Sequence, residues 1–104
     1  MLITNTETIE GRQISEHIGL VRGSTVRARN FGRDIFAGIK NFIGGEISEY
    51  TKLLADSREQ AIERMITDAQ RLGADAIVNV RFTTSAVMQG SSEILAYGTA
   101  VKLK

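Results

Sequence analysis

Residues 31–82, FGRDIFAGIKNFIGGEISEYTKLLADSREQAIERMITDAQRLGADAIVNVRF, decide the fold of this chain. The stretch predicts a short helix, a glycine break at Gly44-Gly45, a long helix, a tight turn and a strand. The short helix has Asn30 available as its N-cap. The segments on either side of the stretch predict strands that complete a sheet beside this last strand.

The long helix has the strongest pattern in the chain. From Ile47 onward its apolar residues recur every three or four positions, as one buried stripe requires. The stripe consists of Tyr50, Leu53, Leu54, Ala61, Ile62, Met65, Ile66, Ala69 and Leu72. On the polar face Arg64 and Asp68 stand four residues apart, so we expect them to pair. Gly73 follows the stripe, where a left-handed residue commonly closes a helix.

Two segments before the central stretch predict strands. The first is Leu2-Ile3, and the second begins at Ile14 and has the sequence ISEHIGLVRGSTVRAR. In the second strand, alternation places on one side Ile14, Ile18, Leu20 and Val26, and on the other His17, Gly19, Val21, Gly23 and Thr25. Gly19 and Gly23 indicate a bulge or the close approach of another backbone.

The strands after the long helix are more apolar. The first presents one apolar face made of Ala76, Val78, Val80 and Phe82, and Gln89-Gly90-Ser91-Ser92 predicts a hairpin loop. The final strand, EILAYGTAVKLK, is apolar on both faces. One helical layer covers only one face of a small sheet, so the second face needs another cover. A neighbouring subunit is the natural cover; the alternative is a twisted sheet with a few exposed apolar side chains. The predicted oligomer interface is Leu95, Tyr97, Val101 and Leu103.

The order β-β-α-α-β-β predicts an α+β fold: a two-layer α/β sandwich with a mainly antiparallel sheet, in one domain of residues 1–104. Hydrophobic residues make up 42% of the chain and the net charge is +1, so no bulk charge favours nucleic acid or membrane as a partner. The absence of cysteine excludes disulfides and thiolate sites. No signal peptide and no long apolar run are apparent, so we expect a cytoplasmic location.

Three arginines are candidates for binding an anion. Arg27, Arg29 and Arg33 lie close together, and Arg33 falls in the first turn of the predicted short helix. Helix N-terminal amides and guanidinium groups together can hold a phosphate or carboxylate. The alternative is that these arginines line a strand end and pair with Asp34 or with a neighbouring subunit's carboxylate. Only Phe31 lies near them as an aromatic platform, so nucleic-acid binding is not expected.

Glu16 and His17 are the candidates for a metal ion. Adjacent strand residues point to opposite faces, so one subunit cannot easily chelate with both, although copies of His17 could converge in a ring. A lone strand histidine is more often a surface or interface residue. No catalytic residues are assigned, because the chain has no GxSxG motif, and Gly44-Gly45 lacks the lysine of a phosphate-binding loop.

The segments RDIFAGIKNFIGG, LGADA and the terminal GTAV resemble the hallmarks of the YbjQ-like family of small bacterial and archaeal proteins. The family is labelled heavy-metal-binding and has no established activity. The resemblance spans nearly the whole chain, and it implies a dodecin-like subunit whose sheet assembles into a ring, usually a pentamer. It also implies that the final strand lies between the two others. Family members often carry a cysteine in the second strand, in the segment that here is Glu16-His17-Ile18-Gly19, and this chain has none.

Two classes of function follow from these observations. The first is a ring-forming cytoplasmic protein, a pentamer by resemblance, with a binding or scaffold role. It would hold a small ligand or a divalent metal ion at the ring axis or between subunits. The alternative is an enzyme with an inter-subunit active site that acts on a small anionic substrate near Arg29 and Arg33. Self-association is the one partnership expected.

Overall fold

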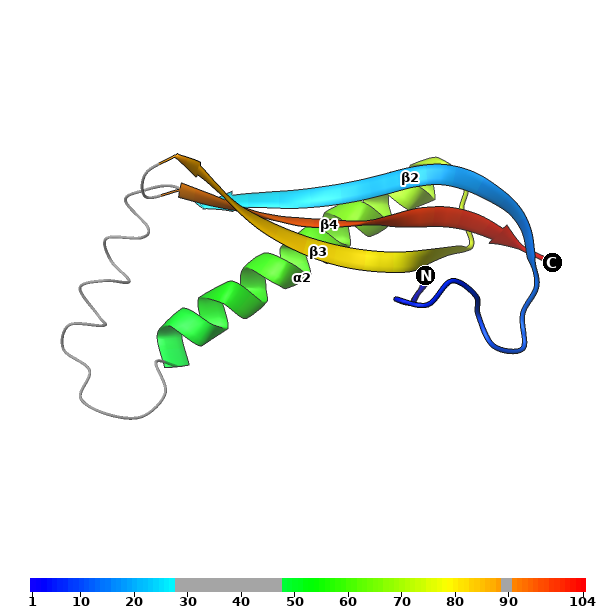
Figure 1. The fold of residues 1–104 in the computed structure, drawn as a ribbon, viewed down its shortest axis with the longest axis horizontal. Helices are drawn as coiled ribbons and strands as arrows, with labels where there is room; N and C mark the ends of the chain where they lie inside the picture. Colours follow the sequence, from blue (N-terminus) through cyan, green and yellow to red (C-terminus); the bar gives the residue numbers. More distant parts are fainter. Residues whose placement is uncertain (28–47, 89–90) are drawn as a thin grey trace.

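The fold is a helix packed on one face of a four-stranded sheet (Figure 1). The structure, a computed structural model, describes residues 1–27, 48–88 and 91–104. Its elements are β1 (Leu2–Ile3), β2 (Ile14–Arg27), α2 (Ser48–Arg71), β3 (Ala76–Met88) and β4 (Ser91–Leu103). The predicted short helix and the centre of the hairpin loop lie outside the described residues. No helix of the described part is long and apolar enough to cross a lipid bilayer.

The strands follow the order β1-β3-β4-β2. β1 runs parallel to β3, while β4 pairs antiparallel with both β3 and β2. The predictions of a two-layer α+β fold, a mainly antiparallel sheet and a central final strand are therefore confirmed. Both chain termini lie at the same end of the sheet (Figure 1).

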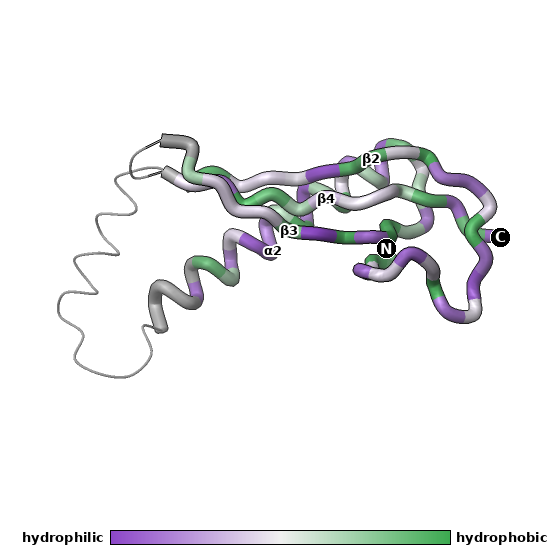
Figure 2. The backbone as a smooth tube through the Cα atoms, viewed as in Figure 1, coloured by the Kyte–Doolittle hydropathy of each residue, from purple (hydrophilic) through white to green (hydrophobic). Residues whose placement is uncertain are grey.

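The long helix ends where the sequence predicts. Gly73 has a φ of 75°, the left-handed conformation that lets the chain turn without a Cβ clash. Its N–H donates to the Gln70 carbonyl at 3.0 Å, and the Ala74 N–H donates to the Ala69 carbonyl at 3.1 Å. Apolar and hydrophilic segments alternate along α2 (Figure 2), as expected for a helix with one buried side.

Helix α2 approaches β2 closely at Gly23, where the strand has no side chain. The buried helix positions are Ser57, Ala61, Met65 and Ala69. A Cβ at Gly23 of β2 would lie 2.2 Å from the Met65 backbone nitrogen and 2.4 Å from the Ala61 carbonyl oxygen. The predicted close approach of another backbone at Gly23 is therefore confirmed, and that backbone belongs to the helix.

Register shifts in β3 and in β2 change the predicted alternation of side chains. In β3 the register slips between Val78 and Arg81, and Asn79 adopts a φ of 54°. Ile77 and Val80 therefore face the helix, whereas Val78 lies on the opposite face. The predicted single face of Ala76, Val78, Val80 and Phe82 is wrong, because an extra residue at a bulge exchanges the two faces.

In β2 the register slips twice against β4, between Ile14 and Glu16 and between His17 and Gly19, where Gly19 has a φ of 150°. Ile18 consequently packs with the helix-side core, whereas Ile14 packs on the other face. The prediction that Ile14 and Ile18 share a side is wrong, although a bulge at Gly19 was one of the two structures that the glycines indicated.

The sheet is covered on both faces at the end that carries the termini. The helix-side core contains Val21, Ala61, Met65, Ala69, Ile77, Val80, Ile94, Ala96 and Ala100. A smaller cluster lies on the other face and consists of Ala76, Val78 and Val101, with Ile9, Ile14 and Leu103 packed against it. The N-terminal segment therefore supplies part of the second cover through Ile9.

We predict that Gly23→Ala destabilises the protein by about 1–3 kcal/mol, the usual cost of overpacking. The added methyl group would meet helix backbone atoms, which cannot rotate away as a side chain can. Urea unfolding at neutral pH measures the effect. Ser24→Ala is the matched control in the same strand and should change stability by less than about 0.5 kcal/mol. A Gly23→Ala protein as stable as the wild type would contradict the backbone contact.

Candidate functional site

The candidate site lies on the face of the sheet opposite α2, which we call the outer face. Arg22 of β2 and Arg81 of β3 both pair with Tyr97 of β4. Directly paired residues in antiparallel strands point to the same side of the sheet. Arg22, Tyr97 and Arg81 therefore form one row across three strands, the arginine row.

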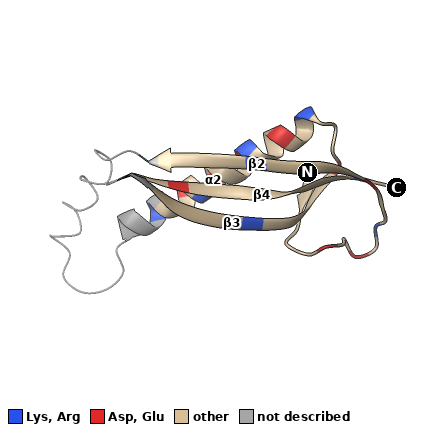
Figure 3. Ribbon diagram, turned by 45° about the horizontal axis from the view of Figure 1, so that its top comes forward, with Lys and Arg blue, Asp and Glu red and all other residues tan. Residues whose placement is uncertain are grey.

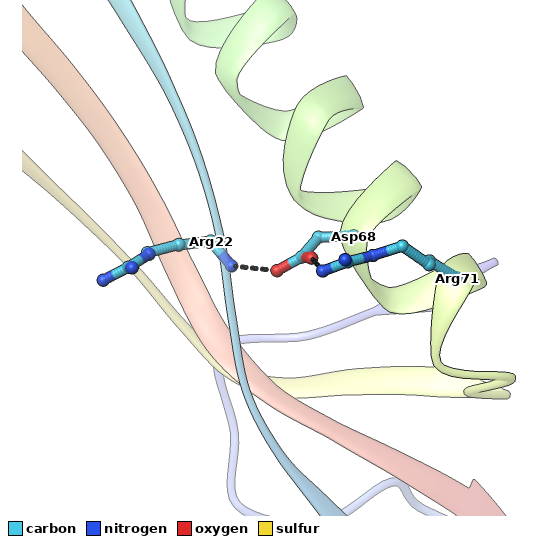
Figure 4. Close-up of polar contacts among 3 residues, drawn as sticks. All are labelled: Arg22, Asp68 and Arg71. Atoms are coloured by element: carbon cyan, nitrogen blue, oxygen red, sulfur yellow. Dashed lines mark hydrogen bonds and ion pairs between the residues drawn. The ribbon is translucent and has the colours of Figure 1, made fainter.

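Both guanidinium groups of the row are accessible. Arg22 and Arg81 are exposed and Tyr97 is half-buried. The Arg22 side chain extends away from α2 (Figure 4). Arg81 Nη1 donates to the Asn5 carbonyl at 2.8 Å and to the Val80 carbonyl at 3.0 Å, so the N-terminal segment positions this side chain. The remaining N–H groups of Arg81 have no hydrogen-bond partner among the described residues and can donate to a ligand.

The rows on either side of the arginine row carry no acid. Their residues are Leu20, Thr99 and Val78 on one side, and Ser24, Leu95 and Thr83 on the other. Figure 3 shows the three long strands coloured mostly as uncharged residues. The two positive charges are thus not neutralised within these rows. Two guanidinium groups beside a tyrosine can bind an oxyanion, because charge-assisted hydrogen bonds from arginine to carboxylate or phosphate are strong.

Helix α2 binds the backbone of Arg22 through the carboxylate of Asp68. The Arg22 backbone N–H donates to Asp68 Oδ2 at 3.2 Å, and Arg71 Nη2 donates to Asp68 Oδ1 (Figure 4). The hydrogen bond from Arg71, followed by the one from the Arg22 N–H, lowers the pKa of Asp68 below its usual value. Arg64 Nη1 donates to the Ser24 carbonyl. The predicted Arg64–Asp68 pair is wrong, because both side chains instead bind backbone groups of β2.

The four predicted interface residues divide into two pairs. Leu95 and Tyr97 are half-buried on the outer face. Val101 is fully buried and Leu103 is half-buried, and both lie in the cluster that includes Ile9. At this end the N-terminal segment supplies part of the cover of the outer face, through Ile9.

The outer face is bare farther from the termini. Leu20 and Val26 are 65% and 55% exposed, although both are apolar residues in the middle or at the end of a long strand. Leu20 lies one row from the arginine row. Apolar and cationic side chains therefore adjoin on the same uncovered surface.

The predicted metal ligands do not come together within one chain. Glu16 pairs with Lys102 and His17 pairs with Val101, the next residue along β4, so the two side chains lie on opposite faces. Across the residues that the structure describes, no three His, Cys, Asp or Glu side chains gather in a metal-binding arrangement.

The predicted anion site is only partly described. Arg27 is the last residue of β2, where its backbone pairs with Ser92, and Arg29 and Arg33 lie outside the described residues. Arg81 was not among the predicted anion-binding residues. Its approach to Arg22 depends on the register of both strands against β4, and the sequence carries no direct signal of that register.

Comparison with known proteins identifies the family. The YbjQ_1 family model, described as "Putative heavy-metal-binding", matches residues 1–104. A UPF0145 protein of Archaeoglobus fulgidus is 58% identical over 104 residues, which cover 100% of this chain and 96% of that one. A UPF0145 protein of Photobacterium profundum is 60% identical over 103 residues, covering 99% of this chain and 100% of that one.

A solved structure shares the fold. It is the crystal structure of a protein of unknown function from Pediococcus pentosaceus, a member of the DUF74 family, with a TM-score of 0.65 and 16% sequence identity. The match covers 100% of this chain and 98% of that one. The full-length family match and the two relatives show that this chain belongs to the YbjQ family of UPF0145 proteins.

Proposed function

We propose that this protein is a self-associating binding protein that holds a small anion against the arginine row. The observation that carries the proposal is the uncovered part of the outer face, where the arginine row lies beside Leu20, Leu95 and Tyr97. A closed ring of five protomers is the assembly that the family resemblance implies, and it is the form we propose. A cytoplasmic location belongs to the same proposal.

The exposed apolar residues support self-association. Leu20 and Val26 keep 65% and 55% of their accessible surface within one chain. Burying a leucine or valine side chain fully contributes about 1.5–3 kcal/mol, so covering the part that both still expose would stabilise an assembly by about 2–3 kcal/mol before association entropy is subtracted. A ring uses a heterologous contact, in which each protomer offers two different surfaces, and the outer face is one of them.

The arginine row supports an anionic ligand. The two positive charges on this face repel each other. A bound anion attracts both of them and offsets that repulsion. Tyr97 lies between the two arginines and adds a phenolic hydroxyl donor and an apolar ring. The site lies on the exposed surface of three strands, so a neighbouring protomer that covers the outer face would complete it.

The ligands available in this chain do not match the heavy-metal-binding description of the family. Heavy metals prefer thiolate or several imidazole ligands, and this chain has no cysteine and one histidine. Glu16 and His17 lie on opposite faces, so the donor set of one protomer does not fit a soft metal ion. Only an assembly that gathers several copies of His17 would supply enough donors.

Light scattering and native mass spectrometry test the assembly. The wild type should give one species several times 11.4 kDa, with a ring of five protomers as its repeating unit. Leu20→Glu and Tyr97→Asp should each shift the mass towards the monomer, because a charge would be buried in the contact. Gln70→Glu, on the exposed face of α2, adds the same charge and should leave the mass unchanged. A monodisperse wild-type monomer at about 100 μM would reject the assembly, since a modest interface of about −8 kcal/mol already gives a dissociation constant near 1 μM.

The anion site can be tested by calorimetry with inorganic phosphate and with benzoate. Arg22→Gln and Arg81→Gln should each weaken binding about tenfold or more, because each removes a charge-assisted hydrogen bond. Arg58→Gln is the matched control, because Arg58 is exposed on α2 and lies outside the row. Binding that is unchanged in both row variants would reject the site.

Metal binding has its own test. We expect zinc and copper to bind no more tightly than micromolar, because several converging ligands are needed for high affinity. Calorimetry on metal-free protein measures this directly. Nanomolar binding that disappears in His17→Ala would contradict the expectation and would indicate convergence of His17 copies.

A further inference from the structure

The outer edge of β3 is covered along only half of its length. β1 pairs with β3 at Ala76 and Ile77 alone. The N-terminal segment then continues along the edge: the Asn79 N–H donates to the Thr6 carbonyl at 2.9 Å, and the Val80 N–H donates to the Thr4 carbonyl at 3.0 Å. Beyond Val80, no described residue pairs with this edge.

The direction of the Val80 N–H identifies the open backbone groups. In an antiparallel pair, alternate residues direct both their N–H and C=O towards the same side. The backbone N–H of Val80 points to the edge of the sheet, away from β4. Phe82, Thr84 and Ala86 therefore also direct their backbone N–H and C=O groups to this edge. Arg81, between them, directs its groups towards Tyr97 of β4. The alternate residues Phe82, Thr84 and Ala86 thus present unpaired backbone N–H donors and C=O acceptors at this edge.

This half of β3 lacks the usual protection of an edge strand. Every side chain from Arg81 to Ala86 is exposed, and Phe82 is 48% exposed. The sequence has no charged residue and no proline from Phe82 to Ser92, although charges and prolines are common means of blocking edge pairing. Helix α2 lies over β2 and β4 rather than over this part of β3 (Figure 1).

The opposite edge of the sheet is different. On β2, the Arg22 N–H is occupied by Asp68 and the Ser24 carbonyl by Arg64, so helix side chains already satisfy part of that edge. A neighbouring strand would have to displace these contacts. The edge of β3 is therefore the better surface for adding a strand.

We propose that the open edge of β3 pairs with the same edge of a second copy of this chain, antiparallel and about a two-fold axis at Thr84. This goes beyond the proposed function, which places the ring contact on the outer face. In this register Thr84 faces Thr84 of the second copy, and Phe82 faces Ala86 of the second copy. Threonine pairs and large-beside-small pairs are favourable across strands, and no like charges meet.

A two-fold contact joins protomers in pairs, whereas a ring contact is heterologous. The edge contact therefore adds to the ring contact and joins two rings. It does not require the arginine row, so the anion site and the edge pairing are independent of each other.

A single engineered cysteine tests the edge pairing, because the chain has no cysteine of its own. Residues that exchange both backbone hydrogen bonds have Cα atoms about 5.5 Å apart, within the about 4.4–6.8 Å range of a disulfide. Thr84→Cys should therefore form disulfide dimers under mild oxidation in most of the protein. Gln70→Cys, exposed on α2, is the control and should form few. Thr84 is exposed, so its replacement should not disturb folding.

The outcomes separate this inference from the proposed function. Rapid cross-linking of Thr84→Cys, with the assembly mass unchanged, supports the edge pairing. Cross-linking no faster than that of Gln70→Cys overturns it, even if the wild type is a ring. Cross-linking of Thr84→Cys only with a protein that carries Val26→Cys also overturns it, because β2 would then be the partner. As a second measure, Thr84→Lys should halve the assembly mass, since two like charges would face each other.

Discussion

The backbone contact between β2 and α2 at Gly23 determines how the two layers of this protein lie. A side chain at that position would overlap the backbone of the helix at Ala61 and Met65, so glycine allows a separation that other residues do not. Two residues after Gly23, Thr25 Oγ1 donates a buried hydrogen bond of 3.1 Å to the Ser57 carbonyl, which reinforces the contact. Because the helix lies so close to β2, it covers β2 and β4 and leaves the far half of β3 bare.

The N-terminal segment covers what the helix does not, but only at one end. It follows the edge of β3 as far as Val80, and Ile9 packs on the outer face against the cluster around Val101. Among the residues that the structure describes, the sheet therefore has a well-covered end, which carries the termini, and a bare end. The surfaces proposed for assembly both extend towards the bare end, where the described residues include the exposed apolar side chains Val26 and Phe82. Exposed apolar surface of this kind is typical of contacts between proteins.

Local features of the sequence predicted the fold well, and features that depend on register were not predicted. Helix periodicity and Gly73 identify α2 and its end, and Gly23 indicates a close backbone approach. The bulge at Asn79 was missed, although asparagine is enriched among residues with positive φ. One extra residue there changes which side chains share a face. The arginine row could not be predicted for the same reason, since Arg22 and Arg81 meet Tyr97 only once both registers are known.

Arg22 connects the two faces of the sheet. Its backbone N–H is held by Asp68 on the helix side, while its side chain lies in the arginine row on the outer face. The lowered pKa of Asp68 means that this carboxylate stays ionised at neutral pH, and that its contribution to stability is lost only as the pH falls through the folded-state pKa. An exposed ion pair such as that of Asp68 with Arg71 contributes about 0–1 kcal/mol, so its role is mainly positional. The position of helix α2 is in this way coupled to the geometry of the candidate anion site, although no helix residue belongs to that site.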